Sequence, residues 1–131
     1  MRPPEAERGS ATVEFALVLP LVLLVALALL QAGLLMVDRL LVANAARAGA
    51  RQAAVSLDDA TVRDAAAGAG GLDPARMRVE IERGGGAGTP VSVTVSYRAG
   101  VALPLVGWLF PANVEMADRV SMRQEVDGSP P

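Results

Sequence analysis

An apolar run of about 23 residues, from Phe15 to Val37, constrains this chain of 131 residues more than any other feature. Gln31 is the only strongly polar side chain within the run. As an α-helix the run would be roughly 34 Å long, which is enough to cross the hydrocarbon core of a bilayer. The sequence therefore predicts one membrane-spanning helix and leaves room for one small domain.

Three interpretations of this run compete: a cleaved secretory signal, a plain single-span anchor, and a pilin-type N-terminal helix. Ala26-Leu27-Ala28 fits a small-x-small cleavage site. The apolar run nevertheless continues to Val37, and Glu14 lies where a secretory signal would begin its uninterrupted apolar core. Basic residues lie on both sides of the run, so charge alone leaves the topology open; they are Arg2, Arg8, Arg39, Arg47 and Arg51.

Small residues and a proline interrupt the run. Pro20 removes one backbone hydrogen bond and is expected to kink the helix. Ala28 and Ala32 are one helical turn apart, with Gly33 beside them. A small-residue face of this kind lets another helix approach closely, although an Ala-rich segment can also produce the spacing by chance.

The helix is expected to continue beyond the apolar run. From Asp38 onward, Leu and Ala residues recur at intervals of three and four, with no proline as far as Val55. Ser10 to Val55 therefore reads as one helix of about 46 residues, roughly 70 Å long. Residues 10–37 would form its membrane half, and residues 38–56 would project from the membrane with one small-residue face.

A second, short helix is expected from about Asp59 to Ala67, ending at Gly68, Gly70 and Gly71. Asp58 and Asp59 stand at its start. An acidic pair can bind a cation, but carboxylates at a helix start also cap backbone N–H groups without any metal. We favour capping.

The remaining pattern predicts a small antiparallel sheet. Apolar and polar residues alternate over 76–83, over 90–97 and over 114–123, as in half-buried strands. The glycine-rich segment 84–89 lies between two strands and lacks a lysine, so it reads as a hairpin and not as a phosphate-binding loop. Such a sheet needs a cover, for which the projecting half of the long helix is the candidate.

The expected fold class is thus α+β: a long N-terminal transmembrane helix extending into a small domain with a short helix and a three-stranded antiparallel sheet. Residues 1–9 would be a disordered cytoplasmic leader, residues 57–126 the small extracytoplasmic domain, and residues 127–131 a disordered tail.

Two features of the expected domain remain open. The stretch from Val101 to Phe110 is apolar but too short to span a membrane. It could cover the sheet, which is the simpler interpretation, or lay Trp108 against the membrane or a neighbouring subunit. Asp118 interrupts the apolar face of the last strand, either at the rim of the sheet or paired with Arg98 or Arg119.

Composition argues against several classes of function. The net charge is −2 without a basic cluster, which gives nucleic acid no electrostatic footprint. The chain has no Cys and no His, so the commonest metal ligands, the usual general base and the thiol nucleophile are missing. We expect no catalytic residues, metal or cofactor, and no small-molecule substrate.

The N-terminal region resembles TadE-like proteins, which are minor pilins or pseudopilins of the tight-adherence (Tad/Flp) pilus system. The resemblance rests on a G-x-A-x-V-E-F-A opening from Gly9 to Ala16, on Pro20, and on the closing motif A-A-R-x-G-A-R. The residues of the closing motif are Ala45, Ala46, Arg47, Gly49, Ala50 and Arg51.

The resemblance implies a processing site and a topology. A prepilin peptidase would cut between Gly9 and Ser10, with the leader in the cytoplasm and the C-terminal domain outside the inner membrane. Glu14 would then be the fifth residue of the mature chain and could pair with the new amine, commonly that of an adjacent subunit, to set the register of assembly. The implied partners are the membrane, other pilins, Tad inner-membrane platform proteins and the peptidase.

Overall fold

The computed structural model describes residues 5–126, with side chains from Gly9 onward. Its elements are α1 (Glu5–Val55), α2 (Asp59–Gly70), β1 (Met77–Arg83), β2 (Pro90–Gly100) and β3 (Asn113–Arg123), with 3-10 turns η1 (Pro74–Arg76) and η2 (Pro104–Val106). The predicted α+β fold class, with its long helix, short helix and three-stranded antiparallel sheet, is confirmed. The expected tail and the first four residues of the expected leader lie outside the described residues.

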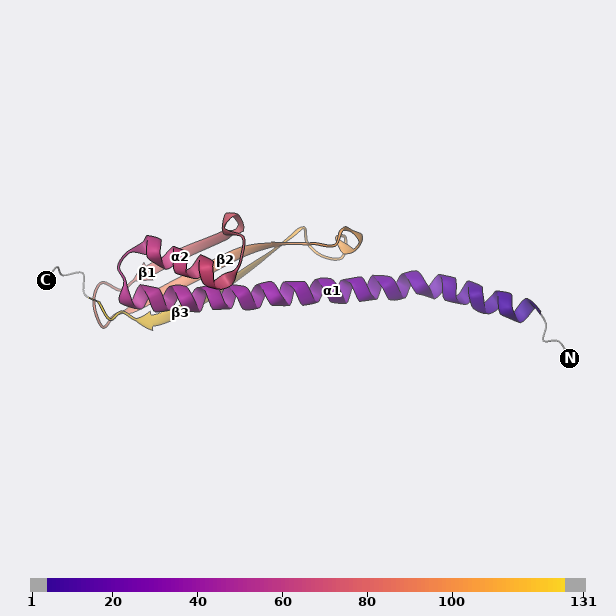
Figure 1. Cartoon of the computed structure of the whole chain (residues 1–131), viewed down its shortest axis with the longest axis horizontal. Coiled ribbons are helices and arrows are strands. Elements are labelled where there is room, and N and C mark those ends of the chain that lie inside the picture. Colours follow the sequence, from indigo (N-terminus) through magenta and orange to yellow (C-terminus); the bar gives the residue numbers. More distant parts are fainter. Residues whose placement is uncertain (1–4, 127–131) are drawn as a thin grey trace.

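Helix α1 contains 51 residues, which corresponds to roughly 77 Å. It ends at Val55, as the spacing predicts, but begins at Glu5 and not at Ser10. The residues from Glu5 to Arg8 are good helix formers, so the helix extends back into the expected leader. Pro20 lies inside α1, and Figure 1 shows the N-terminal end of the helix (indigo) turning away from the line of the rest.

The sheet has the order β1-β2-β3, with both pairs antiparallel. Val93 of the central strand lies opposite Ile81 of β1 and Val120 of β3. The predicted alternation on β2 is confirmed, because Val91, Val93, Val95 and Tyr97 are buried on one face. The opposite face carries polar and charged side chains, which include an Arg119–Glu82 ion pair of 2.6 Å.

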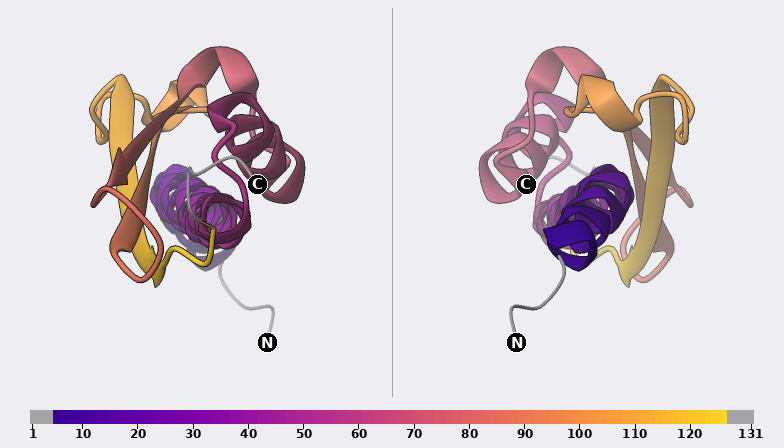
Figure 2. Two further views of the ribbon diagram at one scale, coloured as in Figure 1. Left: turned by 90° about the vertical axis from the view of Figure 1, so that its left-hand side faces the viewer. Right: turned by 90° about the vertical axis from the view of Figure 1, so that its right-hand side faces the viewer.

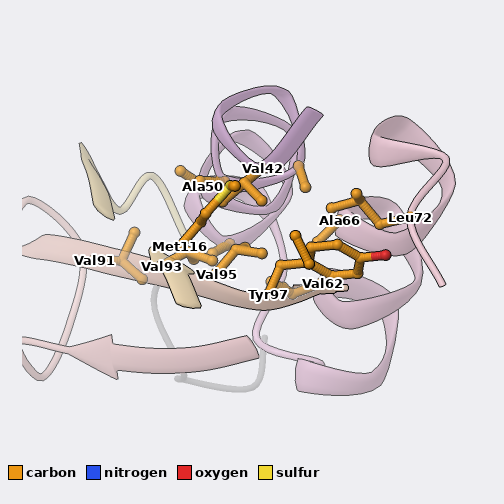
Figure 3. Close-up of a cluster of buried hydrophobic side chains, with 14 residues drawn as sticks. Val42, Ala50, Val62, Ala66, Leu72, Val91, Val93, Val95, Tyr97 and Met116 are labelled. Atoms are coloured by element: carbon orange, nitrogen blue, oxygen red, sulfur yellow. The ribbon is translucent and has the colours of Figure 1, made fainter. Parts of the chain in front are cut away.

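The two helices cover the apolar face of the sheet. Helix α1 lies over β2 and β3, and α2 lies beside α1 (Figure 2). Figure 3 shows Val42 and Ala50 of α1 above the β2 valines, with Val62 and Ala66 of α2 beside them. The C-terminal half of α1 therefore covers the sheet as expected. We call this half of α1 (residues 38–55), together with α2 and the sheet, the α+β domain.

Helix α2 is longer than predicted. It ends at Gly70, and Gly71 closes it with a left-handed φ of 59°. The predicted stop at Gly68 is wrong, because the helix continues through it to Gly70. Glycine at position 70 serves close packing, since an added Cβ there would lie 3.1 Å from Ala45 Cβ of α1. Glycine at this position lowers the intrinsic helix propensity of α2 but allows α2 to pack closely against α1.

Arg83, at the end of β1, joins the adjacent ends of the two helices. Its Nη1 donates to the carbonyl oxygen of Ala53 at 3.1 Å, and its Nη2 lies 2.9 Å from Asp59 Oδ1. A cation at the C-terminal end of α1 is favourable because it faces the free carbonyls and the negative end of the helix dipole. Asp59 is therefore half of an ion pair.

Asp58 caps α2, as the capping interpretation predicts. Its carboxylate accepts hydrogen bonds from the Thr61 hydroxyl at 2.6 Å and from the Ala60 N–H at 3.0 Å. These two bonds, the Thr61 bond first, lower the pKa of Asp58 below its ordinary value.

The Asp58 cap should make folding sensitive to acid. A carboxylate with a lowered pKa in the folded state stabilises the fold above its unfolded pKa, and this stability is lost as the pH falls through the folded pKa. We expect thermal unfolding of the wild type to lose more stability as the pH falls below about 5 than that of Asp58→Asn, which keeps an acceptor but does not titrate. Equal acid sensitivity of the two proteins would contradict this role of the charge.

Candidate membrane and assembly site

The N-terminal half of α1 carries an uncovered apolar surface. Among the described residues, α1 is the one helix long and apolar enough to cross a membrane. Its large apolar side chains are exposed to an extent that water would strongly disfavour, with Leu17 at 72%, Phe15 at 65% and Leu21 at 63%. The described residues leave most of this apolar surface uncovered, as in a helix that spans a membrane.

The expected processing site lies on this free part of the helix. Gly9, Ser10 and Glu14 are all exposed and all inside α1. A Cβ added at Gly9 would meet no atom within 4 Å. Ser10 and Glu14 are four residues apart, so they lie one above the other on the same side of the helix.

The expected small-residue face is divided in the structure. Ala28 is half-buried and lies on the side of α1 that faces the rest of the chain, whereas Ala32 is exposed. Gly33 has open space around it, with no atom within 4 Å of an added Cβ. Only Ala32 and Gly33 thus offer a free surface for close approach of another helix.

Gln31 is the site residue to which sequence reasoning assigned no role. Its side chain is almost fully buried, with 1% exposure, in a helix whose neighbouring turns are mostly exposed. Its Oε1 accepts hydrogen bonds from the backbone N–H groups of Ala102 at 3.1 Å and Leu103 at 3.2 Å. The one signal in the sequence was that Gln31 is the only strongly polar side chain of the apolar run.

These two hydrogen bonds attach the β2–β3 connection, residues 101–112, to the middle of α1. Figure 1 shows this 101–112 loop (orange) extending past the end of the sheet along α1. The interpretation of this stretch as cover for the sheet is therefore wrong. Val106 is buried, but Leu105 and Trp108 remain 73% and 71% exposed.

The closing motif serves packing within the chain. Ala45, Ala46, Gly49 and Ala50 are buried, whereas Arg47 and Arg51 are exposed. A Cβ added at Gly49 would lie 3.0 Å from Val93 Cγ1 and 3.3 Å from Ala66 Cβ. The small residues of the motif therefore bring α1 close to both β2 and α2.

Asp118 has neither of the expected arginine partners in an ion pair. Arg98 pairs with Glu115 at 4.0 Å, and Arg119 pairs with Glu82. Asp118 is half-buried opposite Val95, and its Oδ1 accepts a hydrogen bond from the Arg119 N–H at 3.0 Å. It lines a cavity of about 100 Å³ together with Arg39 of α1.

A larger hollow of about 330 Å³ lies at the start of β1 and is lined by Arg76, Arg78, Arg98, Glu80 and Glu115, among others. Its charges are mixed, and Arg76 and Arg98 are already paired with Asp73 and Glu115. In residues 9–126, whose side chains the structure describes, no group of three or more His, Cys, Asp or Glu residues is placed to hold a metal ion.

Comparison with known proteins agrees with the resemblance seen in the sequence. The model of the TadE-like protein family matches residues 9–51, which run from the expected processing site to the last arginine of the closing motif. No curated protein and no solved structure matches the chain significantly. The match shows that this segment is similar to TadE-like proteins.

Proposed function

We propose that this chain, TadE-like over residues 9–51, is a structural component of a Tad pilus, acting as a membrane-anchored minor pilin or pseudopilin. The observation that carries the proposal is that the family match covers two structurally different parts of α1. The matched segment contains the uncovered apolar part of α1 and the small-residue part that packs on the sheet. One helix thus supplies both an anchor in lipid and the scaffold of the α+β domain.

The proposed location is the inner membrane, with the N-terminus in the cytoplasm and the α+β domain outside. The resemblance to TadE-like proteins supports this direction. The proposed partners are other pilins or pseudopilins, the Tad platform proteins and a prepilin peptidase. Ala32 and Gly33, which are exposed on α1, supply the closest approach for a partner helix.

We further propose that the Gly9–Ser10 bond is cut. A peptidase needs the backbone of its substrate to be locally open, and this bond lies only about one turn from the start of α1 at Glu5. The first four N–H groups of a helix have no partner within the helix, and helix ends open at little cost. Gly9 itself weakens a helix by roughly 0.5–1 kcal/mol relative to alanine.

Cleavage would create an ammonium group at the first residue of the shortened helix. A positive charge there is unfavourable beside the positive end of the helix dipole. Glu14, one turn further along the same side, offers a carboxylate to this amine or to that of a neighbouring subunit. In lipid each of these charges is costly alone, so pairing across subunits would favour one register of assembly.

The intact mass of the protein from the membrane fraction tests cleavage. We expect loss of residues 1–9 when a prepilin peptidase is co-expressed, and retention of the leader in Gly9→Val, because a branched side chain at the cut obstructs a site that accepts glycine. Gly33→Val is the matched control, since it places the same side chain in open space on the same helix and should be cut normally.

An intact leader in the wild type would contradict cleavage. Absence of the protein from sheared surface fibres and from complexes with platform proteins would contradict the assembly role, and would favour a single-span protein whose outer domain binds some other ligand. Release of the protein from membranes by alkali would contradict the anchor.

A further inference from the structure

The 101–112 loop presents an apolar surface at the level of the membrane helix. From Val101 to Ala112 it contains no charged, hydroxyl or amide side chain. Leu105, Trp108 and Leu109 are exposed on it, and the loop lies along the half of α1 whose own apolar side chains are uncovered. The two apolar surfaces are therefore continuous and require the same environment.

We propose that the 101–112 loop is immersed in the outer leaflet of the bilayer and is held at that depth by Gln31. The inference rests on the membrane anchoring proposed above. It assigns lipid as the occupant of the exposed loop surface and a positioning role to Gln31, the one strongly polar side chain of the apolar run.

The length of the apolar run supports this depth. If water reached as far as Gln31, the apolar helix from Phe15 to Leu30 would be about 16 residues, or roughly 24 Å, which is short of the ~30 Å hydrocarbon core. A full crossing needs about 20 residues, as far as Leu34, and the apolar run continues to Val37, so Gln31 lies roughly 5–9 Å inside the end of the spanning segment. A loop bonded to Gln31 must then enter the bilayer with it.

The hydrogen bonds of the loop suit such an environment. Irregular backbone is tolerated at membrane depth only where its polar groups are satisfied. Gln31 accepts from Ala102 and Leu103, and the N–H groups of Val106, Gly107 and Leu109 donate to carbonyl oxygens within the loop. Five of the ten N–H groups of the loop thus have partners, and the other five need the water and headgroups of the interface, which places the loop in the shallow part of the leaflet. Pro104 and Pro111 have no N–H to satisfy.

The burial of side chains around Gln31 agrees with a loop that packs against one side of α1. Leu24, Leu27, Ala28 and Leu35 are half-buried and recur with Gln31 at intervals of three and four, so they share its side of the helix. Leu29 and Leu30, on other sides, are exposed at 69% and 54%. Lipid would thus contact the helix on its free sides and the loop on its outer surface.

Trp108 is the only tryptophan of the chain and reports the position of the loop without labelling. The full chain would be reconstituted in phosphatidylethanolamine–phosphatidylglycerol vesicles whose acyl chains carry bromine near the headgroup or near the bilayer centre. We expect blue-shifted Trp108 emission, quenched more by shallow than by deep bromine and little by aqueous acrylamide, because indole favours the membrane interface.

A double variant that exchanges the side chains of residues 30 and 31 tests the positioning role of Gln31. Leu30→Gln combined with Gln31→Leu keeps composition and hydropathy but moves the amide away from the loop. Ala102 and Leu103 then lose their acceptor, so we expect Trp108 to move toward water, with weaker bromine and stronger acrylamide quenching. Unchanged quenching in this variant would overturn the role of Gln31.

Other outcomes separate this inference from the proposed function. Strong acrylamide quenching without bromine quenching, in protein that resists alkaline extraction, would overturn the immersion and leave the anchor intact. Loss of bromine quenching as the protein-to-lipid ratio rises would overturn it in favour of a second copy of the chain as occupant. Wild-type protein released by alkali would overturn the anchor and the inference together.

Discussion

Gly49→Val is expected to lower the free energy of unfolding of the α+β domain by about 1–3 kcal/mol. The position has no room, since an added Cβ already lies 3.0 Å from Val93 Cγ1 and 3.3 Å from Ala66 Cβ. These neighbours are fully buried and belong to β2 and α2, so neither can move without disturbing the core. A branched side chain would push α1 away from both at once.

Hydrogen exchange of the β2 backbone, measured on the full chain in detergent micelles, provides the readout. The expected loss corresponds to exchange roughly 5 to 150 times faster if β2 exchanges through global opening. Gly68→Val is the matched control, because it makes the same change in a helix with no atom within 4 Å of the new Cβ. Equal acceleration in both variants would show that valine acts through helix propensity and not through the close packing at Gly49.

Glu14→Ala is expected to leave membrane insertion unchanged and to reduce pilus assembly at least about tenfold. Removing one partner of a charge pair in lipid leaves the other uncompensated, and costs of 3–5 kcal/mol are usual for buried pairs. Because the effect is required only when subunits meet, the single chain should still insert. Surface fibres, sheared and quantified by immunoblot, measure assembly, and alkaline extraction measures insertion.

The matched control for Glu14 is Val18→Ala, which truncates an exposed side chain one turn further along α1 without removing a charge. It should assemble normally. Glu14→Gln separates charge from shape, and we expect it to behave like the alanine variant. Wild-type piliation in Glu14→Ala would sink the register role, provided that intact mass shows the leader processed equally in all variants.

Much of the fold was predictable because its elements have clear periods. The period-two alternation around Val91, Val93 and Val95 identified the buried face of the central strand, and the spacing of three and four gave the end of α1 at Val55. These signals are local. Each depends on neighbours in sequence that share one face.

The errors arose where distant residues decide the structure. Gly68 and Gly70 are expected to end the second helix. At position 70, however, glycine is needed because Ala45 of α1 leaves no room for a larger side chain. The 101–112 loop looked like cover for the sheet, but its hydrogen bonds go to Gln31, about 70 residues earlier. No periodicity reports a contact between segments so far apart.

The sequence places the proposed site residues on α1 but does not show which side of the helix faces the rest of the chain. Gly9, Ser10 and Glu14 were expected together and do lie on the exposed start of α1. Ala28 and Gly33 were assigned to one packing face, yet the structure places Ala28 toward the loop and leaves Gly33 open. Alanine spacing alone does not show which side of a helix its own chain will occupy.

Helix α1 is continuous from its exposed apolar half into the α+β domain, so a tilt of one half also tilts the other. Val55 lies about 27 Å beyond Val37, so a tilt of about 20° in a bilayer would carry that end roughly 9 Å sideways. The sheet is packed on the same helix, and the 101–112 loop that joins two of its strands is bonded to Gln31, so the sheet moves with α1. With the proposed membrane anchoring, the orientation of the α+β domain depends on bilayer thickness: a thinner membrane increases the tilt of α1, and the sheet tilts with it.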